Sequence, residues 1–349
     1  MPQFHSLIIS EVKTETPNSV SITLEVPEEL TQSFTFKAGQ YITFKHTVEG
    51  TEVRRSYSVC SSPMSGQLSV GVKKVEGGTF SVFANTQLKA GDSLEVMRPE
   101  GNFVFEPNVS NEKTYAAFVA GSGITPVLSI IKDVLEREPK SSFILVYGNQ
   151  TLIETMFYSE LEELKSIYTN RFKIEYVFSR SQEINALRGR IDHSVVNYLL
   201  KNKYGEASID TFYLCGPESM INEVSETLQS RGIDRKNIFF ELFSSSEEGE
   251  LAENHDGNTT VTITLDDETE TFVMTQNQSV LEAALDRGLD APFSCQGGIC
   301  STCIARVKKG KVEMRKNQIL TDSELEEGFV LTCQSHPTTS TLEIDYDDV

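Results

Sequence analysis

Apolar and polar residues alternate along the first third of the chain. From Val20 to Val26, in "SVSITLEV", every second residue is apolar, which is the pattern of a strand that buries one face. The stretches "YITFKH", "LSVGVKKV" and "SLEVMRP" follow, with turn residues between them. A succession of such strands predicts a small antiparallel β-barrel for residues 1–108.

From residue 109 to 243 apolar runs alternate with amphipathic segments. "TYAAFVAG" is an apolar run that ends in glycine, and "TPVLSIIKDVLERE" after it places apolar residues at helical spacing from Val127 to Leu135. Further apolar runs occur in "FILVYGN", "FKIEYVFS", "TFYLCGP" and "NIFFELF". Strand and helix in alternation predict an α/β domain, a doubly wound parallel sheet with helices on both faces.

A polar, acidic segment, "SSSEEGELAENHDGN", then interrupts the pattern, and we interpret residues 244–256 as a linker. Residues 257–349 form a third part. There, "TTVTITLDDETETFVMT" predicts a hairpin with its turn at Asp266 and Asp267, and "SVLEAALDRGL" predicts a helix capped by Ser279. A length of 349 residues is enough for two or three such domains.

The chain is strongly acidic, with 51 acidic against 31 basic residues and a net charge of −20. This charge argues against nucleic acid or an anionic membrane as a partner and suits docking to a basic protein surface, although acidity also simply favours solubility. The start of the chain has no secretory signal pattern, and no apolar run approaches the roughly 18 residues of a membrane span. We therefore expect a cytoplasmic protein without membrane insertion.

Four of the six cysteines lie close together near the end of the chain. Cys295, Cys300 and Cys303 fall within "CQGGICSTC", and Cys333 follows. In a reducing compartment such a group holds a metal more often than it forms disulfides. The spacing Cys-x4-Cys-x2-Cys with a distant fourth cysteine is that of a plant-type [2Fe-2S] cluster. A zinc site or a loop of free thiols are the alternatives.

A glycine motif, "AGSGITP", stands where a predicted strand gives way to a helix. Gly121 and Gly123 would let the backbone approach a pyrophosphate at the helix N-terminus. We expect Thr125 to cap that helix and Pro126 to begin it. Pro126 occupies the position where the usual dinucleotide motif has its third glycine, so the motif alone is equally compatible with a plain tight turn.

Three more short motifs are compatible with ligand binding. In "FYLCGPESM", Cys215 and Gly216 end an apolar strand at the edge where open α/β sheets bind ligands. In "RRSYSV", Arg55 could bind a phosphate and Tyr57 could cover a ring system. "GGTFS" is a candidate phosphate-binding turn. Each of these stretches is also common in proteins that bind nothing there.

The order of these motifs is more specific than any one of them. "RSYS", "GGTFS", "GSGITP", "CGPESM" and then the cysteine pattern resemble the ferredoxin-NADP reductase superfamily with a plant-type ferredoxin fused at the C-terminus, over essentially the whole chain. "FHSL" and "GRID" extend the resemblance to reductase components of oxygenases. The resemblance implies an FAD-binding barrel (1–108), an NAD(P)-binding domain (109–243), a linker (244–256) and a β-grasp ferredoxin domain (257–349).

The resemblance also implies roles for single residues. Tyr57, Ser58, Cys215 and Glu241 would be catalytic, and Phe243 would replace the terminal tyrosine that covers the flavin in plant-type reductases. The FAD-binding residues would be Arg55, Ser56, Tyr57, Ser58, Gly78, Thr79 and Ser81. The nucleotide-binding residues would be Gly121, Ser122, Gly123, Thr125, Pro126, Ser179, Arg180 and Gly216. The cluster ligands would be Cys295, Cys300, Cys303 and Cys333.

The resemblance and these roles imply an electron-transfer reductase that passes electrons from a nicotinamide nucleotide through FAD and a [2Fe-2S] cluster to a separate oxygenase, expected to be that of a phenylacetyl-CoA epoxidase. Arg180, just after a strand of the nucleotide domain, favours NADPH because arginine accommodates a 2′-phosphate there, while NADH stays possible. The alternatives are another acceptor, such as a steroid or aromatic-ring oxygenase or a hybrid-cluster protein, and a redox-sensing module without turnover.

Overall fold

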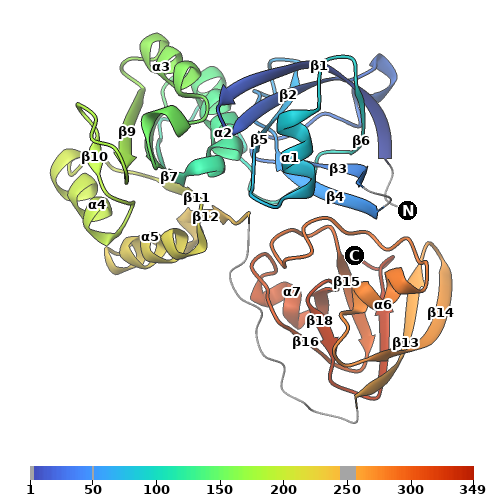
Figure 1. Cartoon of the computed structure of the whole chain (residues 1–349). Helices are drawn as coiled ribbons and strands as arrows, with labels where there is room; N and C mark the ends of the chain where they lie inside the picture. The colour runs from blue at the N-terminus through green and yellow to red at the C-terminus, as the bar shows by residue number, and fades with distance from the viewer. Residues whose placement is uncertain (1–3, 49–50, 244–256) are drawn as a thin grey trace. The chain divides into compact units, whose positions relative to one another are not determined.

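The computed structural model describes residues 4–48, 51–243 and 257–349, so the predicted linker 244–256 lies outside the described residues (Figure 1). The chain divides into two compact units, one of residues 4–243 and one that begins, among the described residues, at Gly257. No helix in the described part of the chain is both long and apolar enough to cross a lipid bilayer.

The first half of the N-terminal unit is an antiparallel sheet in the order β4-β3-β6-β1-β2-β5. An isolated antiparallel bridge between Val59 and Val70 joins the chain after β4 to β5, the strand at the other end of this order. The bridge closes the sheet into the predicted barrel. The elements are β1 (Phe4–Thr16), β2 (Ser19–Glu25), η1 (Glu28–Leu30), β3 (Tyr41–Val48), β4 (Thr51–Ser58), β5 (Leu68–Lys73), α1 (Thr79–Thr86) and β6 (Ser93–Met97).

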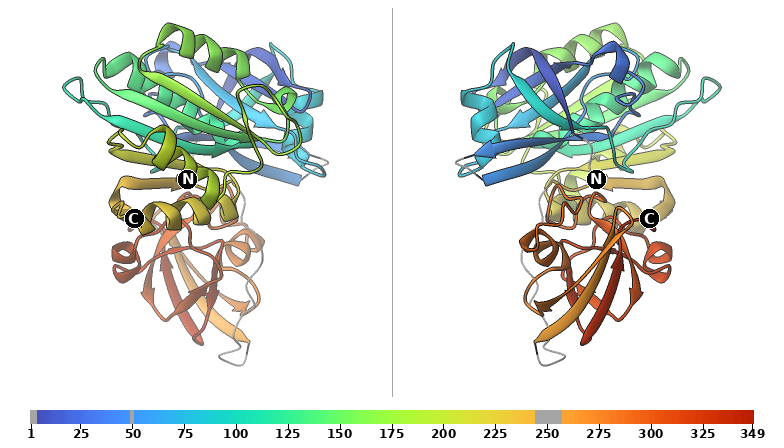
Figure 2. Two further views of the ribbon diagram at one scale, coloured as in Figure 1. Left: turned by 90° about the vertical axis from the view of Figure 1, so that its left-hand side faces the viewer. Right: turned by 90° about the vertical axis from the view of Figure 1, so that its right-hand side faces the viewer.

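The second half of this unit is the predicted parallel sheet, in the order β10-β9-β8-β7-β11-β12, with helices on both faces (Figure 2). The chain runs outward from β7 in both directions, which is the doubly wound arrangement. The elements are β7 (Thr114–Ala120), η2 (Gly121–Gly123), α2 (Ile124–Arg137), β8 (Ser142–Asn149), η3 (Leu152–Glu154), α3 (Tyr158–Ile167), β9 (Phe172–Phe178), β10 (Leu187–Arg188), α4 (His193–Tyr198), the π-helix η4 (Leu199–Lys203), β11 (Thr211–Cys215), α5 (Glu218–Ser230), η5 (Arg235–Asn237) and β12 (Ile238–Glu241).

The barrel has a core of its own, and part of the barrel half also packs into the core of the parallel sheet. Ala38, Phe103 and Phe105 of the barrel half belong to the same buried cluster as the apolar face of α2. A Cβ on Gly71 in β5 would lie 2.6 Å from the Cγ2 of Thr125. The Thr125 side chain therefore packs directly against the backbone of β5, and a larger residue than glycine would not fit there. Such continuous burial makes residues 4–243 one compact unit.

The C-terminal unit has a mixed five-stranded sheet in the order β14-β13-β19-β15-β17 and a small pair of strands, β16 and β18. Asp266 and Asp267 form the turn of the β13–β14 hairpin with positive φ, and Ser279 caps α6 in a capping box with Glu282; both predictions are confirmed. The elements are β13 (Asn258–Leu265), β14 (Glu268–Thr275), α6 (Val280–Asp286), β15 (Ile304–Lys309), β16 (Val312–Met314), α7 (Asp322–Glu326), β17 (Phe329–Leu331), β18 (Ser335–Pro337) and β19 (Thr341–Asp345).

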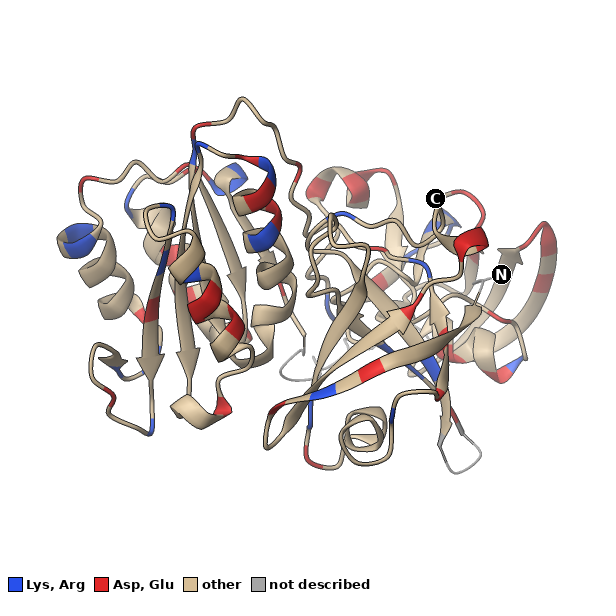
Figure 3. Cartoon of the chain, turned by 90° about the horizontal axis from the view of Figure 1, so that it is seen from above, with Lys and Arg blue, Asp and Glu red and all other residues tan. Residues whose placement is uncertain are grey.

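Acidic and basic residues are interspersed along the helices of the parallel-sheet half (Figure 3). In the C-terminal unit acidic residues gather in the hairpin turn, in α7 and after β19. Asp347 accepts hydrogen bonds from the backbone N–H groups of Asp266 (2.9 Å) and Asp267 (2.8 Å), and so joins two of these groups.

Candidate functional site

The "RRSYSV" stretch is the end of β4, a strand at one end of the barrel sheet. Arg55 is exposed, Ser56 and Tyr57 are half-buried and Ser58 is buried. The Tyr57 ring packs against Phe80 of α1, with a centroid distance of 5.5 Å, and burial raises the pKa of its hydroxyl. Arg55 and Tyr57 are two residues apart on the strand and therefore face the same side, which suits a phosphate and a ring of one ligand.

Ser58 connects the barrel to the last strand of the parallel sheet. Its Oγ donates a hydrogen bond to the Oε2 of Glu241, 3.1 Å away and 183 residues later in the chain. Burial raises the pKa of Glu241 to about 8, and the hydrogen bond from Ser58 opposes this rise. At pH 7 most Glu241 side chains therefore carry a proton, which lies beside a buried hydroxyl.

Cys215 lies next to this pair, because it is the register partner of Glu241 between β11 and β12. The thiol is fully buried, and burial followed by the charge of Glu241 raises its pKa well above the usual value. A Cβ on Gly123 would lie 2.3 Å from the carbonyl oxygen of Cys215. Glycine is thus needed for the glycine motif to pack directly onto the Cys215–Gly216 segment.

The glycine motif itself differs from its prediction in one respect. The helix α2 begins at Ile124 with Gly123 as its N-cap, so the expectation that Thr125 caps the helix is wrong. Thr125 is buried in the first turn, and its Oγ1 donates to the carbonyl oxygen of Ser122 (3.0 Å). Pro126 also falls in the first turn, where its missing N–H leaves no helical bond unmade.

Lys73, at the end of β5, is a neighbour of this motif that sequence reasoning missed. Its Nζ lies 3.6 Å from where a Cβ on Gly121 would be. Gly121 has a φ of 56°, and Tyr147 fixes it by donating a hydrogen bond to its carbonyl oxygen (3.0 Å). The ammonium group of Lys73, from the barrel, thus lies next to the glycine turn of the parallel-sheet half. The lysine in "VGVKKV" carried no signal in the sequence, because the contact joins the end of β5 in the barrel to the turn after β7 in the parallel-sheet half.

Ser179 and Arg180 follow β9 at the same edge of the parallel sheet. The backbone N–H of Ser179 donates to the carbonyl oxygen of Asn149 (3.0 Å), which holds the segment beside the end of β8. Arg180 is exposed, and Arg188 in β10 runs alongside because it is the register partner of Phe178. The Oγ of Ser181 is buried and has no hydrogen-bond partner within the described residues. Exposed guanidinium groups and an unpartnered hydroxyl fit a polar ligand.

The "GGTFS" motif forms the N-terminus of α1. Gly78 is the N-cap and Thr79 the first helical residue. The Oγ of Ser81 accepts a hydrogen bond from the backbone N–H of Val75 (3.1 Å), and a Cβ on Gly78 would lie only 2.5 Å from that Oγ. The turn is therefore closed by glycine and serine together and leaves helix N–H groups available, an arrangement that suits a phosphate.

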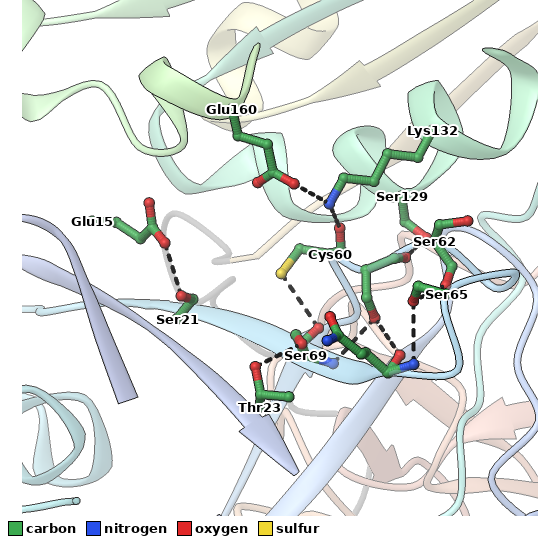
Figure 4. Close-up of polar contacts among 12 residues, drawn as sticks. Glu15, Ser21, Thr23, Cys60, Ser62, Ser65, Ser69, Ser129, Lys132 and Glu160 are labelled. Carbon is green, nitrogen blue, oxygen red and sulfur yellow. Dashed lines mark hydrogen bonds and ion pairs between the residues drawn. The ribbon is translucent and has the colours of Figure 1, made fainter. Parts of the chain in front are cut away.

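Helix α2 fastens the parallel-sheet half to the segment that follows β4 (Figure 4). Ser129 Oγ donates to the carbonyl oxygen of Ser61 (2.7 Å), and Lys132 Nζ donates to that of Cys60 (2.9 Å). Lys132 also pairs with Glu160 (2.7 Å) while its side chain is only 13% exposed. The end of β4, with Tyr57 and Ser58, is thus tied to the helix that begins at the glycine motif.

In the C-terminal unit the four predicted cysteines come together. Cys300, Cys303 and Cys333 are buried and Cys295 is partly exposed, all as free thiols. The thiols of Cys300 and Cys333 lie within hydrogen-bonding reach of Cys295, and with the amides of Gly297 and Ile299 they lower its pKa. Cys303 lies within the same reach of Cys333. Four convergent thiols with inward N–H groups are the donor set that a [2Fe-2S] cluster requires.

Matches to protein families agree with this architecture. Residues 6–105 match the oxidoreductase FAD-binding domain, residues 118–226 the oxidoreductase NAD-binding domain and residues 263–338 the 2Fe-2S iron-sulfur cluster binding domain. The chain thus binds FAD, a nicotinamide nucleotide and a [2Fe-2S] cluster, as the sequence predicted.

Relatives and solved structures share all three parts. The chain is 38% identical to a component of the 1,2-phenylacetyl-CoA epoxidase of Escherichia coli K12, over 99% of each chain. It is 31% identical to the ferredoxin reductase component of 3-ketosteroid-9-alpha-monooxygenase from Rhodococcus rhodochrous, over 97% of this chain and 96% of the relative. The structure of phthalate dioxygenase reductase has the same fold, with a TM-score of 0.62, 23% identity and 98% coverage of both chains.

Both relatives are components of oxygenase systems, the class of protein to which "FHSL" and "GRID" extend the resemblance. Full-length identity at this level, together with the three matched domains, shows the family. The chain belongs to the family of three-domain flavin and iron-sulfur reductases that includes these oxygenase components, and it is an NAD(P)H-dependent oxidoreductase.

Proposed function

We propose that this reductase passes electrons from NADPH to the separately encoded oxygenase component of a phenylacetyl-CoA epoxidase. The observation that carries this proposal is the 38% identity over 99% of both chains with the epoxidase component from E. coli. Family members that serve different oxygenases are less similar, at 31% for the steroid system and 27% for the glycine betaine system. The clustered free thiols suit a reducing compartment such as the cytoplasm.

The chemistry requires an order of carriers, because nicotinamide transfers a hydride, a plant-type cluster takes one electron at a time, and flavin exchanges both. We assign the flavin to the surface formed by β4 and the N-terminus of α1. Tyr57 would cover the ring and Arg55 would pair with a phosphate of FAD. The remaining FAD contacts in this assignment are Ser56, Ser58, Gly78, Thr79 and Ser81.

The nicotinamide would lie between the Ser58–Glu241 pair and the Cys215–Gly216 segment. The hydrogen bond of 3.1 Å between Ser58 and Glu241 supports this, since it brings the flavin strand to the edge at which the parallel sheet binds ligands. The protonated Glu241 keeps a proton beside the reacting rings at neutral pH. Gly121, Ser122, Gly123, Thr125 and Pro126 would hold the pyrophosphate, with Lys73 as an additional cation.

Ser179 and Arg180 would bind the 2′-phosphate of NADPH. Support comes from the exposed guanidinium at the end of β9 and from Arg188 alongside it. An exposed arginine is also an ordinary solvated residue, and NADH is then the alternative coenzyme. The cluster would be held by Cys295, Cys300, Cys303 and Cys333.

Phe243 would take the place of the terminal tyrosine of plant-type reductases over the flavin. Its side chain is 38% exposed, and it follows β12 directly after Glu241 and Leu242. A large apolar side chain that stays exposed two residues after Glu241 suits contact with a ring.

The decisive experiment follows the electrons in order. Anaerobic mixing with NADPH should bleach the flavin bands first and the cluster bands second. Addition of the oxygenase component, phenylacetyl-CoA and oxygen should then give NADPH oxidation that depends on the substrate. Reduction of flavin and cluster without this coupling would favour a steroid or aromatic-ring oxygenase or a hybrid-cluster protein as the acceptor. Failure to turn over cytochrome c as well would favour a redox sensor.

A further inference from the structure

A polar pocket of about 490 Å³ opens on the C-terminal unit beside the cysteine site. One part of its wall is Cys333, and another is Gln296 and Gly297 from the loop that carries the other three cysteines. The remaining lining residues are Asn277, Ser279, Glu282, Arg315, Lys316, Gln334 and His336. The pocket therefore reaches from the surface to one of the four thiols.

The pocket is positively charged although the chain as a whole is acidic. Arg315 and Lys316 are its cations, and Glu282 is the one carboxylate among its lining residues. Glu282 is already engaged, since its Oε2 accepts a hydrogen bond from the backbone N–H of Ser279 (2.8 Å). His336 is 3% exposed and burial lowers its pKa, so it adds no charge at neutral pH.

Arg315 differs from three other basic residues of this unit, which form ion pairs. Arg306 and Lys308 pair with Asp348 at 3.1 and 2.8 Å, and Lys309 pairs with Glu343 at 3.3 Å. The guanidinium of Arg315 has no ion pair with any described residue, and its Nε is buried without a hydrogen-bond partner. A guanidinium left unpaired in a cavity is suited to an incoming carboxylate, which it can bind with two parallel hydrogen bonds.

We infer that this Arg315 pocket is the docking point of the acceptor protein and that it receives a carboxylate side chain from the acceptor's surface. The inference rests on the proposed function, because a reductase that serves a separate oxygenase must bring that protein close to its cluster. A volume of about 490 Å³ exceeds a small anion many times over and admits a glutamate or aspartate side chain. Because Cys333 lines the pocket, an acceptor bound there would lie close to the four cysteines.

The test compares charge reversals at the two residues that flank β16. Arg315→Glu removes the cation from the pocket, whereas Lys311→Glu makes the same change between β15 and β16 and outside the pocket lining. The measurement is NADPH-driven turnover with the oxygenase component of phenylacetyl-CoA epoxidase at varied oxygenase concentration. We expect Arg315→Glu to raise the KM for the oxygenase about tenfold or more, Arg315→Gln to raise it less, and Lys311→Glu to change it less than about threefold.

A second acceptor makes the test independent of the oxygenase. Cytochrome c is basic, so if acceptors dock over this pocket, Arg315→Glu should increase its rate of reduction about threefold or more relative to Lys311→Glu. Flavin bleaching by NADPH, the cluster spectrum and the cluster potential should be the same in all variants. A wild-type chain that reduces cytochrome c but not the oxygenase would contradict the proposed function and leave this second comparison valid.

Three results would overturn the inference. Equal effects of Arg315→Glu and Lys311→Glu on both acceptors would mean that only overall charge matters. A shifted cluster potential with an unchanged KM would make Arg315 a residue that tunes the cluster. Calorimetric binding of inorganic phosphate that depends on Arg315, without any effect of Arg315→Glu on either acceptor, would make the pocket a small-anion site.

Discussion

The two units of this reductase build their sites in opposite ways. In the C-terminal unit three of the four thiols come from nine consecutive residues, 295–303, and the loop between them supplies its own N–H groups. In the N-terminal unit the pair at the centre of the site, Ser58 and Glu241, is 183 residues apart. The first site depends on a loop, whereas the second depends on how a barrel and a parallel sheet are held together.

This difference predicts which changes each site tolerates. A local site fails when one ligand is lost, and the rest of the molecule is unaffected. A site assembled across two halves responds to contacts that touch no ligand, such as those that α2 makes with Cys60 and Ser61 (Figure 4).

The largest effect is expected for Cys303→Ser. Loss of one thiolate should abolish the [2Fe-2S] centre, while NADPH still reduces ferricyanide through the flavin half. The visible and electron paramagnetic resonance spectra measure the cluster. Cys60→Ser is the matched control, because this buried thiol donates to Ser69 at the other end of the chain and its loss should leave the cluster intact. Wild-type cluster spectra in Cys303→Ser would contradict the ligand assignment.

Glu241→Gln should remove a dependence of stability on pH. The pKa of Glu241 is raised by burial from 4.5 to about 8, so its contribution to stability is present below pH 4.5 and is lost as the pH rises toward 8 and through it. Relative to the variant, the wild-type protein should lose on the order of 2 kcal/mol between pH 5 and pH 8.5, a value reduced for partial solvent exposure.

Urea unfolding of the flavin-containing unit at these two pH values measures the difference. Glu138→Gln is a useful comparison, because Glu138 is a fully buried carboxylate that hydrogen-bonds Tyr115 (2.9 Å) away from the site. A constant difference between wild type and Glu241→Gln across this pH range would mean that Glu241 is ionised throughout.

Arg180→Ala should lower the preference for NADPH over NADH about tenfold, as expected when a charge-assisted hydrogen bond to a phosphate is lost. The ratio of kcat/KM for the two coenzymes, with ferricyanide as acceptor, is the measurement. Arg235→Ala removes an exposed arginine in η5 and serves as the control. If Arg180→Ala left the NADPH-to-NADH ratio of kcat/KM unchanged, Arg180 would be a solvated loop residue without a role in coenzyme choice.

Lys132→Ala should destabilise the N-terminal unit by about 1–2 kcal/mol, because the buried carbonyl of Cys60 and the carboxylate of Glu160 both lose a charged partner. It should also slow flavin reduction by NADPH at saturating coenzyme, since the end of β4 is no longer fixed to α2. Lys132→Arg should restore both properties in part. A stability loss with an unchanged rate of flavin reduction would limit Lys132 to a purely structural role.

The sequence predicted most of what depends on neighbouring residues. The three fold types, the turn at Asp266 and Asp267 and the Ser279 cap follow from local patterns, and all are confirmed. The prediction that Thr125 caps α2 was wrong. The N-cap is Gly123, whose position is set by contact with Cys215, 92 residues away, and not by local capping preference. Lys73 was missed for the same reason, since only tertiary structure brings it to Gly121.

The packing of barrel residues into the core of the parallel sheet was also beyond the sequence pattern. Predicted boundaries at residues 108 and 109 separate a barrel from an α/β sheet, whereas Phe103 and Phe105 pack into the same core as α2. An apolar residue at the end of a strand looks the same whether it faces its own domain or the next. The Ser129 and Lys132 contacts span 68 and 72 residues, which no periodicity records.

The smallest effect is expected from salt on the final transfer to the acceptor. The acidic segments "DDETET", "DSELEE" and "DYDD" of the C-terminal unit suit a basic patch on the oxygenase, whereas the Arg315 pocket suits a carboxylate, and contacts of opposite sign fix one orientation. Part of the acidic surface is already engaged within the chain, since Asp348 pairs with Arg306 and Lys308.

Between about 50 and 300 mM salt we expect acceptor turnover to slow only about two- to fivefold, because the Debye length shortens to less than roughly 8 Å. Flavin reduction by NADPH, followed at the same salt concentrations, separates this effect from coenzyme binding. A transfer rate that stays flat or rises with salt would exclude steering by the acidic segments.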